Sequence, residues 1–219
     1  MSSESSSLPD ALRAVLLDPA EATALDVHGR TKAAVLVALY DAFARSPQAA
    51  TSGRRHMDLH AVFTRRRHDL RSHAGEISFP GGRRDAEDES LQITALREAE
   101  EEIGLPRDAV SVVGALAPTP TVATSYGVYP FVGLIEPGRL WTPSAQEVDE
   151  VLELRLSDLR AARTRRRLTH RGIPFRSDVY DVSDEAVIWG ATARIVGDLL
   201  GRVDPLLDGA GRLAGRGAR

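Results

Sequence analysis

The sequence of 219 residues contains no cysteine, a single lysine and only 5% aromatic residues. The absence of cysteine excludes disulfide bonds, thiolate metal sites and a cysteine nucleophile. No apolar run reaches the roughly 18 residues that a membrane-spanning helix needs, and no basic and apolar leader opens the sequence. We therefore expect a cytoplasmic protein that does not enter the membrane.

The composition favours one folded core. Hydrophobic residues make up 42% of the chain, and this length is typical of a single α/β core with terminal extensions. The 28 basic and 31 acidic residues give a net charge of −3, which provides no overall attraction to nucleic acid. We expect a small-molecule substrate and no nucleic-acid partner, and the sequence leaves open whether the chain forms a homodimer.

A carboxylate cluster stands at the end of a predicted helix in residues 82–105, which read GRRDAEDESLQITALREAEEEIGL. Residues three and four apart share a helix face, so Glu98, Glu101 and Glu102 are expected to point to one place. Hard divalent cations prefer such oxygen ligands and relieve the repulsion between them. Taken alone, the acidic run is more typical of a solvated helix face, with Arg97 paired to Glu101.

The surrounding segment favours the metal-site interpretation. Residues 97–105 match the second half of the Nudix box, Arg-Glu-apolar-any-Glu-Glu-any-Gly-apolar, and the chain resembles Nudix hydrolases, which cleave diphosphates linked to another moiety. The first half of the box is one residue longer than the general pattern. Counting from Gly82 places Asp88 at the expected glutamate, whereas counting back from Arg97 places Glu89 there.

The resemblance implies an α/β (α+β) Nudix fold, a mixed β-sheet sandwiched between helices. It also implies Mg²⁺ or Mn²⁺ held by Glu98 and Glu102, with Glu101 sharing the site and Arg97 orienting a glutamate. Family members often complete this site with a loop glutamate that binds metal or acts as the base. Two residues are candidates for that role, Glu147 and Glu150.

A second motif lies upstream, in residues 62–82, which read VFTRRRHDLRSHAGEISFPGG. It resembles the additional motif of Nudix coenzyme A diphosphatases at every spacing, so coenzyme A or a related nucleotide is the expected substrate. The resemblance implies that Arg66, Arg71, Gly81 and Gly82 bind it, because guanidinium groups suit phosphate. Arg67 replaces a small residue of the motif, and is expected to narrow the pocket or to add a phosphate contact. The neighbouring His68 and His73 are more typical of structural histidines than of phosphate ligands.

The rest of the chain suggests three parts: an N-terminal extension (1–54), a Nudix domain (55–203) and a flexible tail (204–219). Periodicity predicts helices over 8–17, 31–43 and from 188 to about 200. It predicts strands over 57–64, 109–117, 128–135 and 175–182. The basic run at 163–167 is expected on a hairpin edge, where charge prevents unwanted strand pairing. Nucleic-acid binding is the weaker interpretation of this run, because it lacks interleaved aromatic residues.

Two alternatives to coenzyme A hydrolysis stay open. The first is a Nudix hydrolase of another substrate, such as ADP-ribose, NADH, a dinucleotide or a nonstandard nucleoside triphosphate. The second is a non-catalytic Nudix module that senses a nucleotide. The three glutamates argue against the second, because a module that only binds has no use for metal ligands that repel one another.

Overall fold

The computed structural model describes residues 7–27, 31–45, 57–69, 75–121, 125–170, 173–183 and 186–207. Its main sheet consists of β1 (Thr31–Asp41), β2 (Leu59–Arg66), β3 (Ile77–Ser78), β4 (Gly81–Arg83), β5 (Ser111–Ala115), β6 (Thr119–Pro120), β7 (Tyr126–Leu134) and β8 (Val148–Arg155). The central order is β3-β2-β1-β7-β5, and β4, β6 and β8 pair with β1, β7 and β2. The sheet is mixed, because β1 and β7 are parallel and its other pairs are antiparallel.

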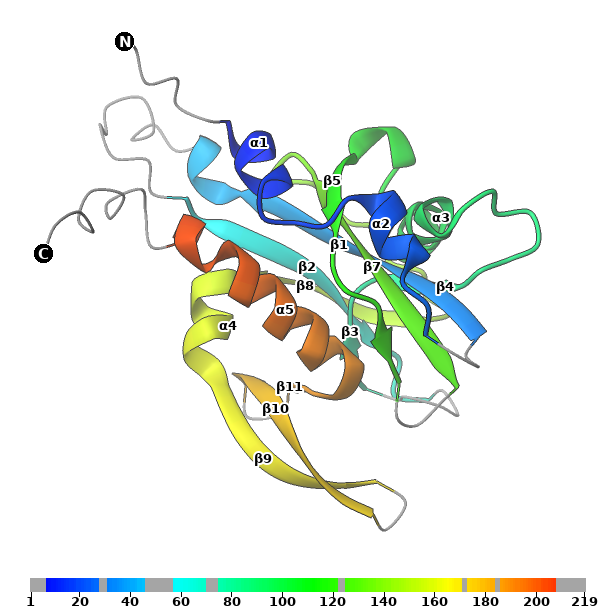
Figure 1. The fold of residues 1–219 in the computed structure, drawn as a ribbon, viewed down its shortest axis with the longest axis vertical. Coiled ribbons are helices and arrows are strands. Elements are labelled where there is room, and N and C mark those ends of the chain that lie inside the picture. Colours follow the sequence, from blue (N-terminus) through cyan, green and yellow to red (C-terminus); the bar gives the residue numbers. More distant parts are fainter. Residues whose placement is uncertain are drawn as a thin grey trace, which may run out of the picture.

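Helices cover both faces of this sheet (Figure 1). They are α1 (Leu8–Arg13), α2 (Pro19–Ala24), α3 (Leu91–Ile103), α4 (Leu156–Ala162) and α5 (Gly190–Leu207), with short 3-10 turns at Ala42–Arg45 and Arg107–Ala109. One buried cluster joins the sheet to α3, and a second joins it to α1, α4 and α5. The predicted mixed sheet between helices is therefore confirmed.

The predicted helix over residues 31–43 is wrong, because most of this segment forms β1 at the centre of the sheet. Alternate residues of β1 face opposite clusters: Leu36 and Ala38 pack on the α3 side, and Val37 and Leu39 on the α5 side. A strand covered on both faces is apolar at nearly every position and shows no alternation. Such a run is indistinguishable by periodicity from a buried helix.

The other predicted strands are confirmed with shifted ends. Residues 57–64 contain most of β2, and residues 109–117 and 128–135 correspond to β5 and β7. The expected alternation in β2 is incomplete, since Val62 and Thr64 are buried as well as Ala61 and Phe63. The helix expected over 8–17 is confirmed only in its first part, because α1 ends at Arg13; the Ser7 side chain accepts a hydrogen bond from the Asp10 amide at its start.

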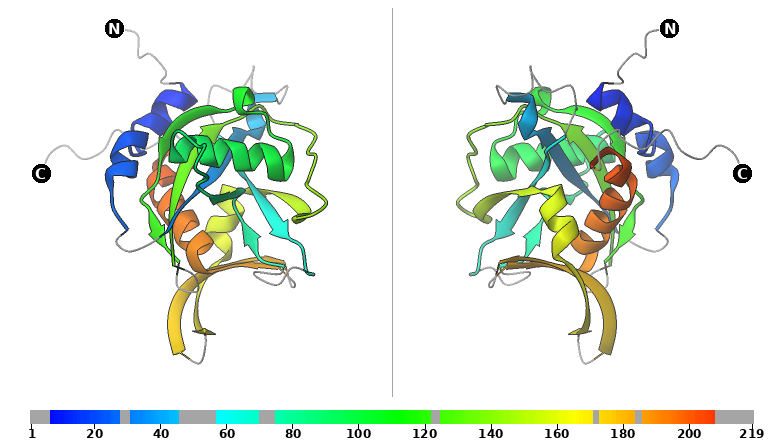
Figure 2. Two further views of the ribbon diagram at one scale, coloured as in Figure 1. Left: turned by 90° about the vertical axis from the view of Figure 1, so that its right-hand side faces the viewer. Right: turned by 90° about the vertical axis from the view of Figure 1, so that its left-hand side faces the viewer.

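A second, three-stranded sheet follows α4 and has the order β11-β10-β9, with β9 (Arg163–His170), β10 (Ile173–Ser183) and β11 (Ala186–Ile188). The hairpin of β9 and β10 projects from the rest of the molecule (Figure 2). The basic run 163–167 lies on β9, an edge strand, as the sequence predicted. α5 follows β11 and continues beyond its predicted end.

The division at residues 54 and 203 stays a prediction about domain organisation. The structure shows only that β1, which precedes residue 54, is hydrogen-bonded into the same sheet as β2 and β7. The predicted flexible tail (204–219) is wrong in its first four residues, which belong to α5, and the rest of it lies outside the described residues. No helix in the described part of the chain has the length and apolarity needed to span a membrane.

Candidate active site

The helix that carries the glutamates has well-defined ends. The Ser90 side chain caps α3 by accepting a hydrogen bond from the Ile93 amide at 3.2 Å, an interaction worth about 1 kcal/mol. Gly104 ends the helix in the left-handed conformation at φ 67°, which favours glycine. A stripe of residues on the other side of the helix faces the core: Leu91, Thr94, Ala95, Ala99 and Ile103 are all buried.

The loop before α3 is anchored by the buried carboxylate of Asp88. Arg97 donates to it twice, Nε to Oδ1 and Nη2 to Oδ2, both at 3.0 Å. Thr94 Oγ1 and the Asp85 amide also donate to Oδ2. These bonds, led by those from Arg97, hold the pKa of Asp88 well below its usual range. Of the two carboxylates that the sequence offered here, Asp88 contacts Arg97, while the Glu89 side chain is exposed.

Arg97 links this loop to the glutamates of the helix. Its Nη1 donates to Glu98 Oε1 at 2.9 Å and to Glu101 Oε2 at 3.0 Å. The Arg97 side chain is only 14% exposed, so these bonds form in a partly desolvated environment. The guanidinium group therefore holds the positions of both carboxylates, in agreement with the orienting role expected for it.

Glu98 and Glu102 are carboxylates removed from water. Burial raises the pKa of Glu98 despite the neighbouring Arg97. Burial also raises the pKa of Glu102 to about 8, and the negative charges of Glu98 and Glu147 add to this shift. Glu102 Oε2 accepts a hydrogen bond from the Gly81 amide at 3.2 Å. Glu101, by contrast, is 59% exposed.

The glycine pair lies directly against these carboxylates. Gly81 and Gly82 belong to β4, which pairs with β1, so the turn expected at this point is a short strand. A β-carbon on Gly82 would collide with the Glu98 carboxylate, and one on Gly81 would collide with the Ala34 carbonyl oxygen. Glycine at both positions thus lets the backbone approach the helix and the neighbouring strand.

The donor set suits a hard divalent cation. Burial raises the pKa of both Glu98 and Glu102, and the charge of Glu98 adds to the shift of Glu102, so a bound cation would offset the cost of these charges. Among the described residues, no three acidic or histidine side chains are already gathered around one point. Arg97 occupies an oxygen of Glu98 and one of Glu101 in this arrangement.

The structure separates the two candidate loop glutamates. The negative charge of Glu147 raises the pKa of both Glu98 and Glu102, which places Glu147 on the side of the helix glutamates. Its Oε2 lies 3.6 Å from Nη1 of Arg66. Glu150 instead lies on β8, where its Oε2 is 3.4 Å from Nε of Arg65.

Arg66 and Arg67 have different surroundings although they are adjacent in sequence. Arg66 lines a cavity, and its positive charge lowers the pKa of Glu102. Arg67 does not line this cavity: it donates to both oxygens of Asp69, Nε to Oδ1 at 2.8 Å, and to the Ala145 carbonyl. The expectation that Arg67 narrows the pocket therefore finds no support in the described residues. Arg71 and His73 lie outside those residues.

The cavity has a volume of about 560 Å³ and lies between the main sheet, the β9–β10 hairpin and the start of α5. Gly81 and Gly82, which contact Glu102 and Glu98, form part of its wall. The opposite wall comprises residues that sequence reasoning did not assign to a site, including Arg165, Phe175 and Trp189. Arg165 belongs to the basic run and Trp189 to the segment that opens the last helix, and both segments were singled out in the sequence. Only the fold shows that their side chains line a cavity.

Comparison with known proteins agrees with this arrangement. The family model of the NUDIX domain matches residues 50–173, which is more than half of the chain. The chain belongs to the NUDIX domain family. It is therefore an enzyme of the Nudix hydrolase class, a group that generally uses divalent metal ions.

Two relatives of this Nudix chain carry the name uncharacterized Nudix hydrolase NudL. The protein from Photorhabdus laumondii is 40% identical over 144 residues, which cover 65% of this chain and 76% of the relative. The protein from Yersinia enterocolitica is 39% identical over 144 residues, which cover 65% of this chain and 73% of the relative. A crystal structure of a MutT/nudix family protein from Enterococcus faecalis shares the fold, with a TM-score of 0.50 at 14% identity over 92% of this chain and 71% of that one.

Proposed function

We propose that this Nudix hydrolase cleaves the diphosphate of coenzyme A to 3'-phospho-AMP and 4'-phosphopantetheine. The observation that carries the proposal is the convergence of the upstream motif on one cavity: Arg66, Phe79, Gly81 and Gly82 all line it. These residues come from β2, β4 and the segment between β3 and β4. The motif that resembles coenzyme A diphosphatases therefore forms a wall of the cavity that adjoins the glutamates.

In this proposal Glu98 and Glu102 hold Mg²⁺ or Mn²⁺, and Glu101 shares the site. When bound, the cation neutralises diphosphate oxygens and lowers the pKa of a water molecule. Arg97 holds Glu98 and Glu101 in position through its bonds to Asp88. Of the two loop glutamates, Glu147 is the better candidate for the base, because it lies among the charges that act on Glu98 and Glu102.

The reaction needs no covalent enzyme intermediate. The oxygen of a water molecule forms a bond to one phosphorus, the bridging P–O bond breaks, and the bridging oxygen leaves with the other phosphate. Two phosphate monoesters result, and the water protons pass to the base and to solvent. The thiol end of coenzyme A is remote from this bond, so thioesters of modest size are expected to be cleaved as well.

We assign Arg66 to the diphosphate rather than to the separate ribose phosphate of coenzyme A. Arg66 lies beside Glu147, and its charge acts on Glu102, so its guanidinium group is close to the expected point of cleavage. Arg66→Ala should then reduce kcat/KM for coenzyme A and for 3'-dephospho-coenzyme A by similar factors, roughly ten- to a hundredfold. A loss confined to coenzyme A would place Arg66 at the ribose phosphate instead.

The second candidate function is hydrolysis of another nucleoside diphosphate derivative, such as ADP-ribose, NADH or a nonstandard nucleoside triphosphate. Arg67 favours it, because this residue departs from the coenzyme A motif. A binding module that only senses a nucleotide has less support. Such a module gains nothing from two desolvated carboxylates whose pKa values are raised by burial and by neighbouring negative charges.

A substrate screen with product analysis tests the proposal. Purified protein with Mg²⁺ or Mn²⁺ is incubated with coenzyme A, acetyl-coenzyme A, ADP-ribose, NADH and nucleoside triphosphates, and initial rates are compared. We expect the highest kcat/KM with coenzyme A or its thioester, and 3'-phospho-AMP as the nucleotide product. A preference of tenfold or more for any substrate without the pantetheine group would contradict the proposal.

A further inference from the structure

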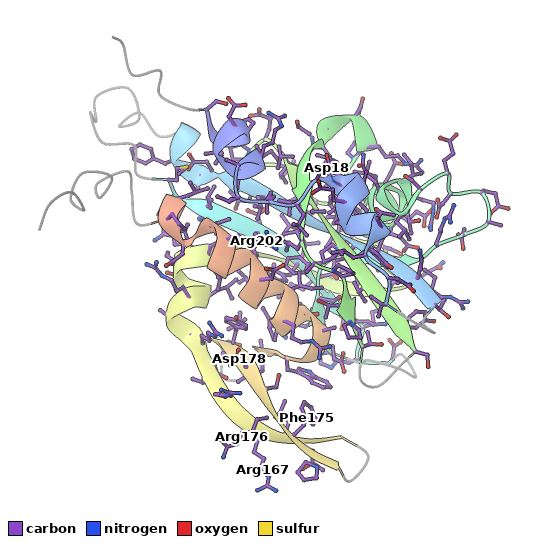
Figure 3. The ribbon with its side chains drawn as sticks, in the orientation of Figure 1. Asp18, Arg167, Phe175, Arg176, Asp178 and Arg202 are labelled. Carbon is purple, nitrogen blue, oxygen red and sulfur yellow. The ribbon has the colours of Figure 1, made fainter. Side chains whose placement is uncertain are left out.

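The far wall of the cavity is formed by elements that follow the matched Nudix box in sequence. Arg165 lies on β9, Phe175 and Arg176 lie on β10, and Trp189 lies just before α5. Figure 3 labels Phe175, Arg176 and Arg167 on the hairpin, where Arg167 is the strand partner of Arg176. These side chains come from elements other than α3 and β4, which hold the glutamates and the glycine pair, so they are placed to contact a part of the substrate other than the diphosphate.

The cavity carries an excess of positive charge. Its charged lining consists of five arginines, Arg66, Arg83, Arg165, Arg176 and Arg194, and two acidic residues, Glu76 and Asp178. Asp178 is engaged by Arg163, with Nη2 at 2.7 Å from Oδ2. Among the described residues, neither Arg165 nor Arg176 forms an ion pair. Two guanidinium groups that line a cavity and form no ion pair among the described residues are suited to an anion.

The strand register brings these two guanidinium groups together. Arg165 is paired with Asp178, and Arg176 is paired with Arg167, so all four residues share one face of the hairpin. Arg165 and Arg176 are diagonal neighbours on that face, a spacing that long side chains bridge. They can therefore reach the same anion, and a phosphate monoester offers the oxygens for two bidentate contacts.

Aromatic side chains line the same cavity as this basic pair. Phe175, Trp189 and Tyr126 all line the cavity and are half-buried. The Arg83 guanidinium carbon lies 5.9 Å from the centre of the Tyr126 ring, which adds a cationic group over an aromatic face. Aromatic faces of this kind stack on nucleobases, and the contact is tolerant of the base. An anion site next to aromatic faces is the combination that a phosphorylated nucleoside requires.

We propose that the β9–β10 hairpin and the start of α5 hold a nucleoside that carries a phosphate monoester on its ribose. Arg165 and Arg176 bind that phosphate, and Trp189 packs against the base. The cavity volume of about 560 Å³ lies in the range of small-molecule sites. This proposal rests on the proposed function for the position of the diphosphate, and it deepens that function by assigning the residues that recognise the additional phosphate.

Calorimetric binding of two ligands without a diphosphate tests the subsite directly. Adenosine 3',5'-bisphosphate and AMP are titrated into the metal-free protein in EDTA, with Arg165→Ala, Arg176→Ala and Arg167→Ala as variants. Arg167 is the matched control, because it is an exposed arginine of the same hairpin face that does not line the cavity. Circular dichroism and unfolding temperature verify that each variant is folded, and a glutamine substitution at the same position replaces any alanine variant that is not.

We expect the wild type to bind the bisphosphate at least about tenfold more tightly than AMP, because only the bisphosphate reaches the hairpin arginines. Arg165→Ala and Arg176→Ala should each remove most of this preference and change AMP binding less than about twofold, whereas Arg167→Ala should leave both affinities unchanged. Trp189→Ala should weaken the binding of both ligands by similar factors. The proposal is overturned if the wild type shows no preference, or if the Arg165 and Arg176 variants behave like Arg167→Ala or lose both ligands equally.

The same measurements separate this inference from the proposed function. If coenzyme A is not a substrate, the bisphosphate preference and its dependence on Arg165 and Arg176 are still measurable, because neither ligand has a bond that the enzyme cleaves. If coenzyme A is the substrate but Arg165→Ala lowers kcat/KM equally for coenzyme A and 3'-dephospho-coenzyme A, the function stands and the subsite is wrong.

Discussion

The guanidinium group of Arg97 donates to both carboxylate oxygens of Asp88, each at 3.0 Å, in a place where Asp88 is 5% exposed. A buried pair of this geometry is costly to break by removing one partner, because the other charge stays buried without compensation. The same guanidinium group also contacts Glu98 and Glu101. The stability of the loop and the positions of the glutamates are therefore linked through one residue.

Asp88→Asn should destabilise the protein by about 2–4 kcal/mol, since it removes the charge that Arg97 requires and one acceptor. Urea unfolding at pH 7 measures this change. Glu89→Gln is the matched control, because Glu89 is adjacent and exposed, and it should change the free energy of unfolding by less than about 0.5 kcal/mol. Equal effects of the two variants would show that Asp88 is not the anchor of the loop.

The pKa of Asp88 is lowered on folding. Its contribution to the free energy of unfolding is therefore present above the unfolded pKa of about 3.9 and is lost as the pH falls toward the folded value.

Glu98→Gln and Glu102→Gln should each reduce kcat by several orders of magnitude, because each keeps the shape of the side chain and removes a charge proposed to hold the metal. Glu100→Gln is the control on the same helix: Glu100 points to Arg107, with Oε2 2.9 Å from Nε, and its replacement should leave kcat within about twofold. Steady-state kinetics at saturating Mg²⁺ provide the measurement. Near-normal turnover in both the Glu98 and the Glu102 variant would refute the assignment.

Glu102 should make the metal-free protein less stable as the pH rises. Its pKa is raised from 4.5 to about 8 on folding, so the folded state binds the proton more tightly and stability falls between those values. The full effect of this one group is on the order of 5 kcal/mol. In EDTA, Glu102→Gln should flatten the pH dependence of the unfolding temperature. At pH 8 the unfolding temperature of this variant should be higher than that of the wild type. An unchanged slope in the variant would mean that Glu102 is not the group responsible.

Gly82→Ala should reduce turnover by at least about tenfold with little change in fold, because the new β-carbon would displace the Glu98 carboxylate. Gly201→Ala is the control: nothing lies within 4 Å of a β-carbon at this helical position. That control should keep full activity and gain up to about 1 kcal/mol of stability. Full activity of the Gly82 variant would show that Glu98 adjusts without loss.

Hydrolysis of coenzyme A in ¹⁸O-labelled water should place one ¹⁸O in only one of the two phosphate products. The labelled product identifies the phosphorus that water attacks, because the bridging oxygen leaves with the other phosphate. Mass spectrometry of both products provides the measurement. Release of free phosphate, or of pantetheine without phosphate, would show that a different bond is cleaved.

Local features of the site were accessible to sequence reasoning. The cap at Ser90, the stop at Gly104 and the buried stripe of α3 depend on residues within one helix and its ends. The approach of Arg97 to Glu101 follows from helical spacing in the same way. The sequence could not decide between Asp88 and Glu89, because the loop is one residue longer than the general pattern and can be counted from either end. Only the packed fold buries one of the two carboxylates.

Other features depend on contacts between distant segments. The apolar run of β1 predicts that the segment is buried on every side, but it does not distinguish a helix from a strand. The segment is a strand because it pairs with β4 and β7. Glu147 and Glu150 are equivalent by composition, yet they come to lie beside different arginines. The spacing of carboxylates along a helix is a property of a few consecutive residues, so the chemistry of the site is readable in the sequence. The wall that Arg165, Arg176 and Trp189 form opposite the glutamates exists because strand pairing and helix packing join segments far apart in the chain.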